Sequence, residues 1–133
     1  MIEELVVKIQ NESLVISATD EDKRFIGEFT CTKQLICELY PDDDEDSRFL
    51  RNNWLVQSFY ILMSEVTDYC GASFTNEDEE NRFMNLLTNE KKLLIKVHMS
   101  RQNNPFVCVL EVQMSRKMEP NEVFYKFYWD ELK

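Results

Sequence analysis

Two kinds of apolar pattern follow one another along this chain. Near the N-terminus, short runs rich in β-branched and aromatic residues alternate with polar turns, which predicts three antiparallel strands over 5–9, 14–18 and 24–29. Between 49 and 66, apolar residues recur at helical spacing and predict one long amphipathic helix. Strand-like runs then return before a last helical pattern. This segregation predicts an α+β domain, with helices packed on one side of an antiparallel sandwich or flattened barrel.

The segments between these elements carry turn and cap signals. Thr32 is a suitable N-cap for a short helix, which should end before Pro41. The acidic run 42–46 is typical of a solvated loop, because it lacks the glycine-punctuated spacing of a calcium loop. A second acidic loop is expected over 76–81, and 82–87 fits either a strand or a helical turn. The remaining expected strands cover 69–74, 93–99 and 105–114.

Composition limits the compartment and the kind of partner. The 133 residues suit one domain, and 25 acidic against 15 basic residues give a net charge of −10. That charge opposes binding to phosphate backbones, so any contact with DNA should be weak or indirect. No apolar run reaches the ~20 residues that span a bilayer, so no membrane partner is expected. The acidic start, Met1 to Glu4, is unlike a signal peptide, which places the chain in the cytosol or nucleus.

The residues that enzymes use are sparse. Gly27 and Gly71 are the only glycines, which excludes glycine-rich phosphate loops. The single histidine, His98, lies in a predicted strand and is interpreted as a packed or surface residue rather than a base. The cysteines form no CxxC pair and are expected to be free thiols: Cys31, Cys37, Cys70 and Cys108. We therefore expect no catalysis, no cofactor and no metal site.

One stretch resembles a known family. Residues 14–20 form a strand that ends in Thr19-Asp20, and after a short turn Phe25, one residue and Gly27 follow. This order resembles the globular head of the X-ray repair cross-complementing scaffold of non-homologous end joining, and that of its Cernunnos (XLF) paralogue. The family usually has Trp where this chain has Phe25.

A second stretch, 93–132, extends the resemblance. It contains two predicted strands and then Glu119-Pro120-Asn121-Glu122-Val123, which is similar to the Asn-Pro-x-Glu-Val that opens the scaffold's dimerising helix. The Pro105-Phe106 start of its last strand looks more like the Cernunnos paralogue. The resemblance covers most of the chain as an order of elements, although each motif is short.

The resemblance implies a fold and a function. The fold would be a seven-stranded antiparallel sandwich with a helix-turn-helix insert, divided into a head domain at 1–118 and the start of a stalk helix at 119–133. The function would be that of a nuclear, non-catalytic scaffold in double-strand-break repair. Its partners would be a second copy of the chain, a paralogous head domain, and DNA ligase IV through a stalk mostly beyond this chain.

The resemblance also implies two sites. The dimerising helix would use a stripe of apolar residues, with folding back onto the sheet as the alternative: Val123, Phe124, Phe127, Tyr128 and Leu132. The head-to-head surface would pair an apolar centre with bordering groups, with ordinary core packing as the alternative: Val112, Met114, Phe49, Arg51, Arg116 and Lys117.

Two other functions compete with the repair scaffold. The same fold serves centriolar assembly proteins of the SAS family, which would make this a cytoplasmic assembly module. A metal-dependent nuclease acting through Asp20 and Glu28 is the third hypothesis, and the sequence favours it least.

Overall fold

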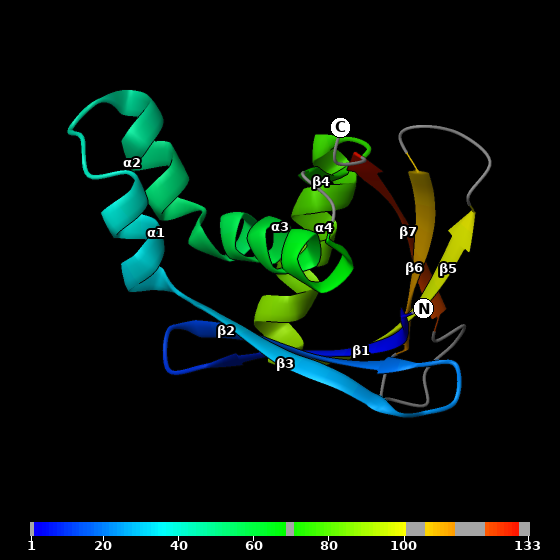
Figure 1. The fold of residues 1–133 in the computed structure, drawn as a ribbon. Helices are drawn as coiled ribbons and strands as arrows, with labels where there is room; N and C mark the ends of the chain where they lie inside the picture. Colours follow the sequence, from blue (N-terminus) through cyan, green and yellow to red (C-terminus); the bar gives the residue numbers. More distant parts are fainter. Residues whose placement is uncertain (1, 69–70, 101–105, 114–121, 131–133) are drawn as a thin grey trace.

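The computed structural model describes residues 2–68, 71–100, 106–113 and 122–130, which form a mixed α+β domain with a curled antiparallel sheet (Figure 1). In chain order its elements are β1 (Ile2–Gln10), β2 (Ser13–Asp20), β3 (Phe25–Thr32), α1 (Lys33–Leu39), α2 (Glu45–Asn52), α3 (Trp54–Thr67), β4 (Gly71–Phe74), α4 (Glu77–Glu90), β5 (Lys92–Ser100), β6 (Phe106–Gln113) and β7 (Glu122–Asp130). The expected fold class, α+β with an antiparallel sheet, is therefore confirmed.

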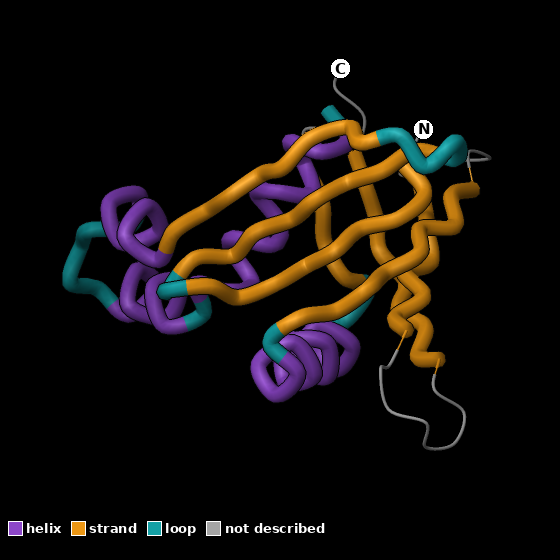
Figure 2. The backbone as a smooth tube through the Cα atoms, turned by 90° about the horizontal axis from the view of Figure 1, so that it is seen from below, coloured by secondary structure: helices purple, strands orange, loops and turns teal. Residues whose placement is uncertain are grey.

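The seven strands form one sheet in the order β3-β2-β1-β5-β6-β7-β4, with antiparallel pairing throughout. The sheet curls into a half-barrel, and α3 and α4 lie inside the curl (Figure 1). Viewed from below, β1, β2 and β3 run side by side, with α1 and α2 beyond one end of them (Figure 2). Those two helices therefore project away from the part of the molecule that the sheet encloses.

Aromatic rings fill the concave side of the sheet. Phe59 of α3 lies 4.8 Å from Phe83 of α4 and 5.5 Å from Phe127 of β7, measured between ring centroids. Phe74 of β4 meets Phe127 edge-on at 5.0 Å. These offset and edge-to-face pairs are the favoured geometries for aromatic side chains, and they join both helices to the C-terminal half of the sheet.

The expected single helix over 49–66 is wrong in its boundaries. The structure divides this region into α2 and α3 at Asn53, whose backbone (φ −102°, ψ 38°) leaves the helical conformation. The Asn53 side-chain amide donates a hydrogen bond to the Phe49 carbonyl oxygen at 2.8 Å. The Asn53 backbone N–H donates to the same carbonyl at 3.0 Å, so both groups of this asparagine cap the end of α2.

The second acidic segment is helical rather than a loop. Asn76 caps α4 by accepting a hydrogen bond from the Glu79 backbone N–H at 2.9 Å. Acidic residues occupy the whole first turn, Glu77 to Glu80, where the positive end of the helix dipole favours negative charge. The ambiguous segment 82–87 is part of the same helix.

The expected C-terminal stalk helix is wrong over Glu122–Asp130, because these residues form strand β7 between β6 and β4. Tyr125, Phe127 and Trp129 are buried, whereas the side chain of Phe124 is 53% exposed. Large aromatic residues favour strands, and pairing on both sides selects the period-two alternation over the helical one. Of the residues predicted for the dimerising helix, Phe127 thus belongs to the core, and Phe124 and Tyr128 lie on the outer face. The backbone of Val123 pairs opposite Val112. Leu132 lies outside the described residues.

Two phenylalanines of β7 test this assignment. Phe127→Ala should lower the free energy of unfolding by about 3–5 kcal/mol, because it leaves a cavity between α3 and the sheet. Phe124→Ala removes the same side chain from the outer face and should change stability by less than about 0.5 kcal/mol. Urea denaturation of both variants measures the difference, and equal effects would contradict the strand assignment.

Candidate interaction surface

The helices α1 and α2 with the loop between them, residues 33–52, form a projection that we call the helical arm (Figure 1). Both helices have side-chain caps. The Thr32 hydroxyl oxygen accepts a hydrogen bond from the Leu35 N–H at 3.0 Å, and Asp44 accepts one from the Ser47 N–H at 2.7 Å. The predicted N-cap at Thr32 and the end of the helix before Pro41 are confirmed.

Arg51 holds the two helices of the arm together. Its Nη1 atom donates hydrogen bonds to the carbonyl oxygens of Tyr40 and Asp42, each at 2.6 Å. These acceptors follow the last turn of α1, so one guanidinium on α2 fixes the course of the loop. The sequence predicted Arg51 as a bordering group of a partner contact, which stays a prediction; within the chain the residue makes these two hydrogen bonds.

Three large apolar side chains of the arm face solvent. The exposed fractions are 60% for Phe49, 52% for Leu39 and 40% for Leu35. Leu35 and Leu39 are one helical turn apart and share a face of α1, whereas Ile36 is fully buried against the domain. Phe49 was predicted to border a head-to-head contact, and its side chain is exposed in the structure. The contribution of the two leucines was not predicted.

Acidic residues surround these apolar groups in the sequence, and all of them are exposed: Glu38, Asp42, Asp43, Asp44, Glu45 and Asp46. The bases of the arm are already engaged. Lys33 lies 3.9 Å from Glu12, and Arg48 lies 3.8 Å from Asp43, both measured from nitrogen to oxygen. Because its carboxylate accepts the backbone hydrogen bond of Ser47, the pKa of Asp44 is held below its usual value. The arm therefore has an excess of negative charge at neutral pH.

The proposed head-to-head surface is not supported at its centre. Val112 is fully buried and pairs with Ile95 of β5, which is also fully buried, so it faces the core. For Val112 the structure therefore agrees with the alternative of ordinary core packing. Met114, Arg116 and Lys117 lie outside the described residues.

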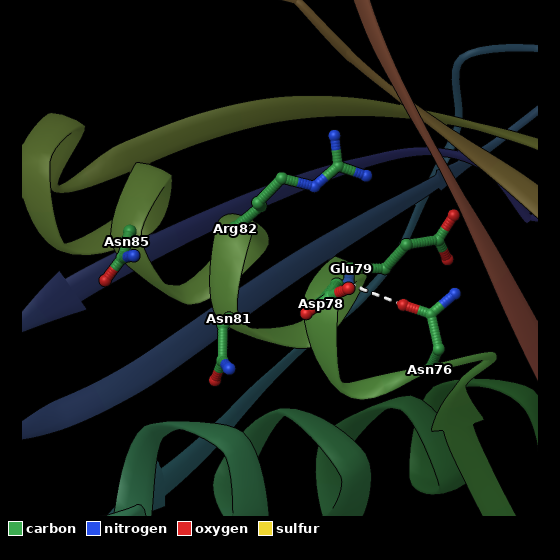
Figure 3. Close-up of a pocket in the computed structure, with 6 residues that line it drawn as sticks. All are labelled: Asn76, Asp78, Glu79, Asn81, Arg82 and Asn85. Carbon is green, nitrogen blue, oxygen red and sulfur yellow. Dashed lines mark hydrogen bonds between the residues drawn. The ribbon is translucent and has the colours of Figure 1, made fainter.

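A shallow hollow of ≈ 540 Å³ lies along the start of α4 (Figure 3). Its lining residues all come from this segment: Asn76, Asp78, Glu79, Asn81, Arg82 and Asn85. Figure 3 shows that their side chains fan out around the helix rather than converge on one point.

The charged groups beside this hollow hold the fold together. Glu79 accepts hydrogen bonds from the Thr75 hydroxyl at 2.8 Å and from the Lys126 backbone N–H at 3.2 Å. The Arg82 guanidinium lies 5.5 Å from the ring centroid of Tyr125. These contacts fasten α4 to β7, so this surface is better explained by packing than by ligand binding.

The other side chains that were considered for catalysis or metal binding also make contacts that stabilise the fold. His98 is exposed on β5 and lies 3.0 Å from Glu111 of β6, which agrees with its interpretation as a surface strand residue. Asp20 accepts hydrogen bonds from the backbone N–H groups of Asp22 and Arg24, both at 2.9 Å, and so shapes the turn after β2. Glu28, its partner in the nuclease hypothesis, accepts a hydrogen bond from the Ser17 hydroxyl at 3.3 Å. Within the described ranges, no cluster of three or more His, Cys, Asp or Glu residues has the geometry to hold a metal ion.

The thiols agree with the expectation of free cysteines where they are described. Cys31, Cys37 and Cys108 are unpaired with one another, and Cys70 lies outside the described residues. Burial raises the pKa of the Cys108 thiol to about 12, so this group is protonated at neutral pH. A protonated, buried thiol is a poor nucleophile.

Comparisons with known proteins give no match to a family model, a curated protein or a solved structure. Among the described residues, no helix combines the length and apolar character required to cross a membrane.

Two arginines of α2 test how the arm is held. Arg51→Met removes both carbonyl contacts and should lower the free energy of unfolding by about 1.5–3 kcal/mol. Arg48→Met removes only an exposed pair with Asp43 and should cost less than about 1 kcal/mol. Urea denaturation compares them, and an equal loss in both variants would contradict the role assigned to Arg51.

Proposed function

We propose that this chain is a non-catalytic protein-binding module whose contact surface is the helical arm. The observation that carries the proposal is the exposure of Leu35, Leu39 and Phe49 on a segment that Arg51 and two helix caps hold in a defined shape. Exposed aromatic and aliphatic side chains gathered on one projection are typical of a protein contact.

The packing of the core favours a protein-binding function over binding of a small molecule. A curled sheet commonly binds ligands in its concave side, but here the aromatic rings of Phe59, Phe83 and Phe127 pack there. Because α3 and α4 occupy that side, the surface groups available for function are on the arm and on the outer face of the sheet (Figure 1).

A narrower proposal is the scaffold of double-strand-break repair. It is supported by the resemblance of 14–29, a segment that forms the β2–β3 hairpin of this chain. It loses the support of the stalk helix, because 122–130 is a strand. Homodimerisation, contact with a paralogous head or DNA ligase IV, and nuclear localisation are retained as parts of this narrower proposal. The centriolar assembly module, with its cytoplasmic localisation, rests on the same resemblance and has no separate support.

The general proposal is tested by removing the apolar groups of the arm. Leu39→Ser/Phe49→Ser should abolish co-purification of a discrete partner from cell extract, and should leave the circular dichroism spectrum unchanged because both side chains face solvent. Phe124→Ser, which alters an exposed aromatic residue on β7, is the matched control and should retain the partner. The partner is then identified and the binary complex rebuilt from purified proteins. A partner that binds all variants equally would contradict the role of the arm.

The same purification distinguishes the narrower proposals. DNA ligase IV or Ku bound to the wild-type chain, and reproduced with purified components, supports the repair scaffold. Centrosomal localisation without sensitivity to DNA damage supports the assembly module. DNA cleavage that is lost in Asp20→Asn/Glu28→Gln would support the nuclease and contradict the non-catalytic proposal.

A further inference from the structure

We propose that the occupant of the helical arm is a basic amphipathic segment of another protein, most simply a helix with lysine or arginine bordering an apolar stripe. This inference deepens the proposed function and rests on it, because it names the chemistry of the partner that the same surface would bind.

The apolar part of the surface sets the first requirement. Leu35 and Leu39 present two aliphatic groups one helical turn apart, and Phe49 adds an aromatic ring from the second helix. A partner must supply large apolar side chains at a matching spacing to remove these groups from water. An amphipathic helix does this with residues that recur every three or four positions.

The charge of the surface sets the second requirement. Asp42 and Asp43 precede α2, and Glu45 and Asp46 form its first turn, all in contact with solvent. Residues 33–52 contain six acidic side chains against three basic ones, Lys33, Arg48 and Arg51, so the arm keeps an excess of negative charge. Lysine or arginine side chains from a partner would complement this acidic border and accelerate association.

The same charge disfavours the other possible occupants. A second copy related by two-fold symmetry would place one acidic arm against another, with like charges facing across the interface. Nucleic acids and anionic membranes carry the same sign of charge as the arm and would be repelled. A basic protein segment satisfies both the apolar and the electrostatic requirement.

The experiment measures the binding of a defined probe to the full chain. The probe is a fluorescein-labelled peptide of leucine and lysine, about five helical turns long, with leucine at helical spacing. Fluorescence anisotropy should detect binding that weakens with added salt, because the charged groups are exposed. A leucine–glutamate peptide with the same spacing controls for the sign of the charge, and a serine–lysine peptide controls for the apolar stripe.

Two pairs of variants separate the arm from the rest of the surface. Leu39→Ser/Phe49→Ser should weaken binding of the leucine–lysine peptide at least about tenfold, whereas Phe124→Ser should leave it within about twofold. Asp42→Asn/Asp46→Asn should weaken it about threefold. Glu3→Gln/Asp22→Asn removes the same charge near the other end of β3 and should have a clearly smaller effect. Thermal unfolding of each variant verifies that the fold is kept.

The outcomes that overturn the inference are distinct. Equal weakening by the two charge variants would show that the peptide responds only to net charge. Unchanged binding by Leu39→Ser/Phe49→Ser would place the contact elsewhere, and equal binding of the leucine–glutamate peptide would exclude the charge requirement. Arm-dependent binding to phosphatidylcholine vesicles with no peptide binding would replace the protein partner by a lipid surface. Co-purification of a partner from cell extract could depend on the arm while no peptide distinguishes the wild-type chain from the arm variants. In that case the proposed function stands and only the basic partner is refuted.

Discussion

The pairing of β1 with β5 joins the two halves of this domain. It brings Leu5 opposite Ile95 and Val7 opposite Leu93, and all four side chains are buried. Without this pairing, the N-terminal strands β1–β3 and the C-terminal strands β5–β7 would be separate sheets, each with one apolar face exposed. With it they form one curved surface, and α3 and α4 cover its concave side. The pair joins residues almost ninety positions apart in sequence, so it incurs a loop-closure cost that local contacts avoid.

The position of the arm follows from where β3 ends. Helix α1 starts directly after β3, at the same end of the sheet as the turn between β1 and β2 (Figure 1). The arm is tied to the turn between β1 and β2 by the hydrogen bond from the Lys33 N–H to the Glu12 carbonyl oxygen at 2.9 Å. The arm is thus held to the sheet where α1 begins. No other part of the described chain covers Leu39 and Phe49, so both side chains stay in contact with water.

Local signals were enough to predict much of the fold. The β-branched run over 14–18 that predicts a strand, the cap at Thr32 and the stop at Pro41 each act within a few residues, and each was confirmed. Phe124 and Phe127 are at helical spacing, whereas Tyr125, Phe127 and Trp129 alternate as in a strand. Pairing with β6 and β4 decides between the two patterns. That pairing is non-local, so periodicity alone could not resolve it.

The proposed binding surface was predicted only in part. Phe49 was expected at a partner contact, but in combination with Val112, which is core. Leu35 and Leu39 were missed because an apolar residue in a short helix is normally assumed to face the domain. The signal that would have found them is the acidic run 42–46 after that helix, since charged residues lie at surfaces rather than in cores. The run was expected to be a loop throughout, but Glu45 and Asp46 begin α2.

The central claim is that the arm, rather than the outer face of the sheet, is where this protein binds its partner. Backbone amide chemical shifts of the isotope-labelled full chain, recorded during titration with a binding partner or the leucine–lysine peptide, test it most directly. The account predicts that the largest changes fall within 33–52 and that the amides of β5, β6 and β7 change little. Changes concentrated on β6 and β7, with the arm unaffected, would contradict it.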